Sequence, residues 1–206
     1  MPFGNFTLPS VVDQFGLTMT SQPLFGGVPP VDSGPAVRQF LATFGQLALG
    51  INTEKARSEW MIAPVVGELW VRSRNGGIYV LSGVDFTVDK EEGLSGVVDF
   101  MVGRGPQVSF VPASPILAVV EAKNESIPGG QGQCAAEMVA ALRFNQKAKN
   151  DIEVVYGVVT NGNNWRFHQL TGKSFAIDTR EYLISEVDQI LGILLHVVGL
   201  NPVPAP

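Results

Sequence analysis

The chain has 206 residues, 45% of them hydrophobic and 16% charged, and its formal net charge is −5. This composition excludes an intrinsically disordered polyampholyte and favours one globular domain with a sizeable core. The acidic balance excludes a surface that is basic throughout, so any nucleic-acid site must be local or must use divalent cations to offset the charge. A single cysteine, Cys134, excludes an intrachain disulfide and a zinc site built on cysteines.

The sequence carries no signal for a membrane. Its first residues lack the positive segment and the apolar run of a secretory signal peptide. The most apolar late stretch, residues 190–200, is too short to span a bilayer and contains His196. We therefore expect a cytoplasmic protein that has no membrane partner.

Composition divides the chain into three segments. Residues 1–35 are rich in glycine and proline and are predicted to form an arm with little regular structure, or one short strand. Residues 36–200 are predicted to form a single domain. The proline-rich residues 201–206 are expected to form a tail, because proline cannot continue a helix.

Apolar residues at helical spacing predict four helices. The predicted helices are residues 35–50, a segment from Thr53 toward Trp70, residues 133–147 and residues 181–198. Thr53 is the expected N-cap of the second helix, and Pro64 is expected to kink or break it. The glycine-rich residues 129–132 are predicted to form a loop. The wide apolar face of the last helix predicts packing in the core or, alternatively, the contact of a homodimer.

Between these helices the periodicity is that of strands. The predicted strands are residues 78–88, 94–102, 116–123, 153–160, 165–170 and 175–178. The first two are expected to form a hairpin. A strand–helix–strand crossover follows the hairpin, which implies an α/β fold with a mixed central sheet flanked by helices.

Three charged residues occur where strands of this sheet are expected to be buried. Glu121 and Lys123 are two residues apart and therefore project to the same side of their strand. Asp99 lies among apolar residues of the neighbouring hairpin strand, within reach of Glu121 if the two strands pair. Burying charge is costly unless the charge is paired or bound to a metal. Two carboxylates beside a lysine are the parts needed for metal-assisted hydrolysis of a phosphodiester.

Asp99, followed on the next strand by Glu121-Ala122-Lys123, resembles the signature of the PD-(D/E)XK nuclease superfamily, which has the restriction-endonuclease-like fold. The predicted order of elements is also similar to the core of that fold, which runs helix, three strands, helix and strand. The resemblance covers roughly residues 50–170 and implies a restriction-endonuclease-like core.

Two further residues agree with the resemblance, and one departs from it. Glu59 lies on the helix before the first strand, where many members have a glutamate. Gln133 lies on the helix after the catalytic strand, where members often have a glutamine that helps to position the site or the substrate. The proline that precedes the family's aspartate is absent, because Val98 occupies its position.

The resemblance also implies a role for each residue. Asp99 and Glu121 would hold Mg²⁺ or Mn²⁺, with the backbone carbonyl of Ala122 as a further ligand and with Glu59 assisting directly or through water. Lys123 would orient or activate the attacking water. The expected function is that of a metal-dependent nuclease that hydrolyses phosphodiester bonds, with nucleic acid, DNA in particular, as its partner.

Several alternatives remain open on the sequence alone. Asp85 is a rival to Asp99, and Glu68 is a rival to Glu59. Glu137 lies one helical turn after the glutamine at position 133 and either shares its face or is a solvated charge. The alternative functions are a catalytically inactive module of the same fold that binds nucleic acid or protein, and an unrelated α/β domain without an active site.

Overall fold

The computed structural model describes residues 2–73, 77–106, 110–124 and 126–200, so the tail predicted for residues 201–206 lies outside the described residues. A seven-stranded sheet with the order β1-β7-β6-β5-β4-β3-β2 forms the centre of the fold. Its strands are β1 (Thr18–Gln22), β2 (Ile78–Asp89), β3 (Leu94–Arg104), β4 (Ile116–Ala122), β5 (Val154–Thr160), β6 (Asn164–Thr171) and β7 (Ser174–Leu183). The pairs β1–β7 and β4–β5 are parallel and the others antiparallel, which confirms the predicted α/β class with a mixed sheet.

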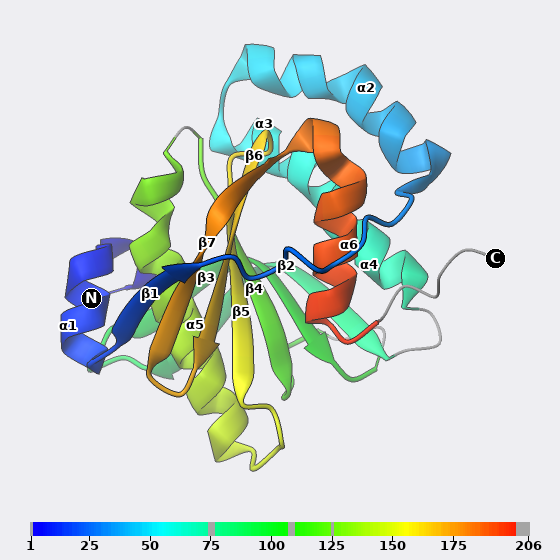
Figure 1. Ribbon diagram of the computed structural model, residues 1–206. Coiled ribbons are helices and arrows are strands. Elements are labelled where there is room, and N and C mark those ends of the chain that lie inside the picture. Colours follow the sequence, from blue (N-terminus) through cyan, green and yellow to red (C-terminus); the bar gives the residue numbers. More distant parts are fainter. Residues whose placement is uncertain (1, 74–76, 107–109, 125, 201–206) are drawn as a thin grey trace.

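Helices cover both faces of this sheet (Figure 1). One face packs against α1 (Leu8–Phe15) and α5 (Ile127–Lys147), and the other against α4 (Ala63–Arg72) and α6 (Val187–Val197). The remaining helical segments are η1 (Phe3–Asn5), α2 (Gly34–Ile51), α3 (Glu54–Arg57), the π-helical η2 (Ser58–Ile62) and η3 (Ile184–Glu186). Two hydrophobic clusters, one on each face, therefore form the core.

The apolar face of α6 is part of the second cluster. Ile190, Leu191, Leu194 and Leu195 are all buried against the sheet or against α4. Core packing within the chain therefore accounts for the width of this face. None of the described helices combines the length and the apolar character needed to cross a bilayer.

The helix predicted to start at Thr53 is interrupted as expected near Pro64. The Thr53 side chain accepts a hydrogen bond from the Ala56 N–H, which confirms the predicted N-cap. The interruption is a π-helical turn, in which the Ala63 N–H donates to the Ser58 carbonyl. Proline has no N–H to continue the α-helical ladder, so the wider turn directly before Pro64 allows the chain to remain helical.

The prediction of little regular structure for residues 1–35 is wrong for much of this segment. Thr7 and Ser10 form a reciprocal cap that starts α1, and Gly16 ends this helix with a φ of 60°. β1, which agrees with the alternative prediction of one short strand in this segment, then joins the edge of the sheet beside β7. The side chains of Phe3 and Val11 are buried in the core beneath α5, so the segment is stabilised by tertiary packing that its composition does not reveal.

The prediction of a loop at residues 129–132 is also wrong, because these residues belong to the first turns of α5. Ser126 caps this helix by accepting the Gly129 N–H at 3.1 Å. A Cβ atom on Gly132 would lie 2.4 Å from the Phe6 carbonyl oxygen. The low helix propensity of glycine is therefore outweighed by the close approach of the N-terminal segment to α5.

The last strand is longer than predicted, and the last helix starts later. Residues 181–183, predicted to be helical, continue β7 and pair with residues 164–166 of β6. An ion pair between Arg166 and Glu181, with 2.5 Å between Nη2 and Oε1, joins the two strands there. Pairing with β6 thus determines that this segment is a strand, because its own periodicity fits either a strand or a helix.

Replacing Gly132 with alanine is expected to destabilise the fold by about 2 kcal/mol or more, because the new methyl group would clash with backbone atoms of residues 6–8. Chemical denaturation measures the loss. The matched control is Gly67→Ala in α4, where no atom lies within 4 Å of the added Cβ and the better helix propensity should stabilise by roughly 0.5–1 kcal/mol. Equal stability of the Gly132→Ala variant and the wild type would contradict the close packing.

His168 is expected to make the stability depend on pH. The ring is fully buried and stacks on Phe175, and burial lowers the pKa of His168 to about 3. In the unfolded chain His168 binds a proton near pH 6.5, and in the folded chain it does not. The free energy of unfolding is therefore unaffected by His168 above pH 6.5 and decreases as the pH falls below that value. The loss from His168 should be about 2 kcal/mol between pH 6.5 and pH 5.

Urea denaturation of the wild type and of His168→Phe across this pH range tests the assignment. The variant should lose less stability than the wild type on acidification. Parallel curves for the two proteins would show that His168 does not cause the dependence.

Candidate active site

The site forms where the ladder between β3 and β4 ends. The last paired residues are Phe100 and Val120, and the next positions in this antiparallel register are Asp99 and Glu121. The Asp99 Oδ2 atom accepts a hydrogen bond from the Ala122 N–H at 2.8 Å and so takes the place of a backbone carbonyl. The two predicted carboxylates are thus placed opposite each other at the end of neighbouring strands.

The regular alternation of the hairpin is interrupted at the same level. Val98 packs on the side of α5, but Phe100, two residues later, packs on the side of α4 and α6. The two residues would share a face in a regular strand, so the alternation slips at Asp99. Gly83, on the paired strand β2, has a φ of 61° at this level, a conformation that favours glycine.

Lys123 forms hydrogen bonds with residues of β4, α5 and β5. Its ammonium forms an ion pair with the Glu121 carboxylate and donates to the Gln133 Oε1 atom of α5 at 3.1 Å. Its backbone N–H donates to the Thr160 carbonyl oxygen of β5 at 2.8 Å. Asp99, Glu121, Lys123 and Gln133 therefore converge in the structure as the sequence analysis expects.

A second glycine of α5 makes this convergence sterically feasible. A Cβ atom on Gly130 would lie 2.7 Å from Cγ1 of Val159 and 2.9 Å from Cγ of Lys123. Without a side chain at this position, the first turns of α5 can pack directly on β5 and on the lysine. This packing places Gln133 within hydrogen-bonding distance of the Lys123 ammonium.

Glu137 is a polar residue of this site whose role the sequence left open. The side chain is fully buried, and its Oε1 atom accepts a hydrogen bond from the Gln133 Nε2 atom at 3.1 Å. Its carboxyl group also lies against that of Glu121. The signal was an acidic residue within a helical run of small and apolar residues, Cys134 to Ala141, which is unusual unless the acid has a specific partner.

Burial and mutual repulsion dominate the electrostatics of the site. Burial, followed by the charge of Asp99, raises the pKa of Glu121 to about 7. Burial also raises the pKa of Asp99, although the Ala122 N–H and Lys123 act in the opposite direction. Burial and then the charge of Glu121 raise the pKa of Glu137 well above its ordinary value. Burial alone would lower the pKa of Lys123, but Glu121 raises it above the ordinary value, so the ammonium stays charged.

A pocket of about 270 Å³ opens beside Asp99. Glu59 of η2 lines it, with 53% of its side chain exposed, and forms an ion pair with Lys55 at 2.6 Å. The other lining residues are Glu54, Lys55, Ser58, Ser82 and Gly83. The structure therefore brings Glu59 and Asp99 to one pocket, although Glu59 belongs to a solvated ion pair.

The rival residues lie elsewhere. Glu68 forms an ion pair with Arg72 at 2.8 Å on α4 and does not line the pocket beside Asp99. Asp85 is exposed on β2 and does not line that pocket either. Asp99 and Glu59 are thus the acids of these two pairs that adjoin the site.

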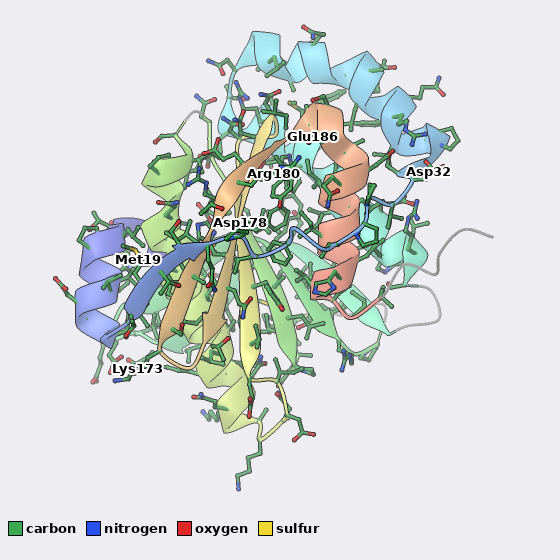
Figure 2. All side chains as sticks on the ribbon, in the orientation of Figure 1. Met19, Asp32, Lys173, Asp178, Arg180 and Glu186 are labelled. Carbon is green, nitrogen blue, oxygen red and sulfur yellow. The ribbon has the colours of Figure 1, made fainter. Side chains whose placement is uncertain are left out.

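A larger pocket, about 440 Å³, lies between α2 and the start of α6. Much of its lining is apolar, and its charged residues already have partners. Arg38 forms an ion pair with Asp188. Glu186 forms one with Arg180, and both of these residues are labelled in Figure 2. The carboxylates of this pocket are thus each compensated by an arginine, and neither has a buried oxygen without a partner as Glu121 has.

The donor atoms of the site suit a hard divalent cation. In the part of the chain that the structure describes, no three or more histidine, cysteine, aspartate or glutamate side chains are arranged to hold a metal ion by themselves. Magnesium, however, is usually bound by one or two carboxylates together with waters and substrate phosphate. Glu121 Oε2 is buried without a hydrogen-bond partner, and the Asp99 carboxylate, at the opposite position of the strand register, supplies further oxygen atoms close to it.

Asp99→Asn is expected to raise the thermal midpoint in metal-free buffer at pH 8 by about 2–4 °C, the shift that about 1 kcal/mol produces in a chain of this size. The raised pKa of Asp99 means that its ionised form opposes folding, and an asparagine oxygen can still accept the Ala122 N–H. Differential scanning fluorimetry with a chelator measures the midpoint. Asp85→Asn, at an exposed position, is the matched control, and its thermal midpoint should change little. A lower midpoint for Asp99→Asn would contradict the inference that the ionised Asp99 carboxylate opposes folding.

Together these groups can hold a cation on carboxylate oxygens and present an ammonium group next to it. That combination suits the hydrolysis of a phosphate ester, in which negative charge must be offset and a water oriented. No protein-family model matches the chain, and no curated protein matches its sequence.

Proposed function

We propose that the protein is a metal-dependent nuclease that hydrolyses phosphodiester bonds of DNA. The observation that carries this proposal is the convergence of Asp99, Glu121 and Lys123 at the shared end of β3 and β4. The element order α4-β2-β3-β4-α5-β5, which agrees with the helix, three strands, helix and strand of a restriction-endonuclease-like core, supports it as well.

Mg²⁺ or Mn²⁺ would be held by Asp99, Glu121 and the Ala122 carbonyl, with Glu59 assisting from the pocket beside Asp99. The buried Oε2 atom of Glu121, which has no hydrogen-bond partner, supports this assignment because a buried carboxylate oxygen needs a proton donor or a cation. A bound cation would supply positive charge that offsets the carboxylates and polarises the substrate phosphate.

The chain's own residues would do the rest. The Lys123 ammonium would orient the attacking water and stabilise negative charge on the phosphate oxygens. Gln133 holds this ammonium in place at 3.1 Å, and the Thr160 carbonyl anchors the lysine backbone. The apolar residues of β4 exclude water from the sheet side of the site, which strengthens every electrostatic interaction there.

DNA cleavage tests the proposal. Purified wild-type protein is incubated with duplex and single-stranded DNA in Mg²⁺ or Mn²⁺, beside a chelator control and Lys123→Ala. Cleavage that requires the metal and falls by about 100-fold or more in the variant is expected, the usual size of a contribution from a positioned proton-transfer group. Lys147→Ala, an exposed lysine at the end of α5, is the matched control and should cleave like the wild type.

Two results would contradict the proposal. Cleavage that persists in the chelator or in Lys123→Ala would assign the activity to another site or to a contaminant. No cleavage under any condition, together with retained metal binding, would favour the catalytically inactive binding module. The formal charge of −5 is consistent with the form of that second function in which the module binds protein, because the charge indicates no broad basic surface for DNA.

A further inference from the structure

Behind Lys123, two polar side chains of α5 form a hydrogen-bonded chain that reaches the site. Gln133 and Glu137 are four residues apart and therefore lie on the same face of the helix, toward β4. The Lys123 ammonium donates to the Gln133 Oε1 atom, and the Gln133 Nε2 atom donates to the Glu137 Oε1 atom, each at 3.1 Å. Glu137 is the inner end of this chain.

This arrangement determines which end of the Gln133 amide faces the lysine. An amide has one acceptor oxygen and one donor nitrogen, and an ammonium can only donate. Because Glu137 Oε1 accepts the amide N–H, the amide oxygen is directed toward the Lys123 ammonium. Glu137 thus selects the orientation of Gln133 that can hold Lys123.

The second carboxyl oxygen of Glu137 belongs to the contact with Glu121. Glu137 Oε2 is buried without a hydrogen-bond partner, as is Glu121 Oε2, and the two carboxyl groups lie within hydrogen-bonding reach of each other. Exposed fractions are 0% for Glu137 and 1% for Glu121. A leucine or methionine would fill this helix position without burying an unpartnered polar atom, so packing alone does not explain an acid here.

We propose that Glu137 is a positioning residue of the metal-dependent site. It orients Gln133, which holds the Lys123 ammonium, and it lies against Glu121, whose carboxylate would hold the cation. The inference rests on the proposed function and extends it to a residue that neither the charge pattern nor the resemblance assigns. Mutation of a residue that does not touch a metal but orients its ligands typically weakens the metal affinity of the protein by 10- to 100-fold.

Glu137→Gln tests this role with little change in shape. Its amide oxygen can still accept from Gln133, but its amide nitrogen would always present a donor to the free oxygen of Glu121, the atom assigned to the cation, whereas the carboxyl group of Glu137 need not place a proton there. Mn²⁺ affinity, measured by calorimetry without DNA, should fall about 10-fold or more. In cleavage assays kcat should fall while KM for DNA changes little, because the residue does not touch the substrate.

Two companion variants make the result specific. Asp178→Asn removes another buried carboxylate, on β7 (Figure 2), and should leave Mn²⁺ affinity unchanged. Glu137→Asp keeps the acid but withdraws it by one methylene, so its Mn²⁺ affinity should lie between those of the wild type and Glu137→Gln. It also provides the test if Glu137→Gln does not fold, as judged by circular dichroism.

Three results would overturn the inference. Unchanged Mn²⁺ affinity and kcat in folded Glu137→Gln, or in Glu137→Asp if only that variant folds, would reject the role of Glu137 and leave the nuclease proposal intact. An equal loss in Asp178→Asn would mean that any buried charge in the fold has this effect. A wild-type protein that neither binds Mn²⁺ nor cleaves DNA would reject the inference and the proposed function together.

Discussion

The carboxylate of Glu121 lies at the end of β4, and only 1% of the residue's surface is exposed. The contacts of the surrounding polar groups follow from the need to compensate this buried charge. A buried charge is unfavourable unless a partner compensates it, and the partner here is the Lys123 ammonium. Asp99 and Glu137 add two further carboxyl groups close by, which makes the compensation incomplete. The fold therefore places more carboxyl groups than positive charges in this site, and packing elsewhere in the domain must offset the resulting loss of stability.

That packing depends on two glycines that allow α5 to approach its neighbours closely. Gly130 and Gly132 let α5 lie against β5 on one side and against the N-terminal segment on the other. The same helix carries Gln133 and Glu137, so its position determines where the polar chain behind Lys123 ends. Larger residues at either glycine would move the helix away from the sheet and with it the groups that hold the lysine.

Sequence patterns were sufficient for the hairpin and for β4 and β5, because the strand periodicity is clear there. The convergence of Asp99 with Glu121 and Lys123 followed from the expected pairing of β3 with β4. Sequence patterns were not sufficient for α1 or for the first turns of α5, where local composition disfavours a helix and tertiary contacts decide. The slip in alternation at Asp99 was also out of reach, because it depends on how two strands pair rather than on either strand alone. For the same reason, whether Glu137 points inward or into solvent depended on which face of α5 meets the sheet.

The two oxygens of Glu121 show how a lysine and a cation would share one carboxylate. Lys123 occupies Oε1, and Oε2 has no hydrogen-bond partner. A cation assigned to this site would therefore take an oxygen that the lysine leaves free, and neither positive group would have to displace the other. Because the two oxygens belong to one buried carboxylate, it would also limit the separation between the two positive groups. On the proposed function, this separation determines where a water could be oriented by the ammonium while a phosphate is bound beside it.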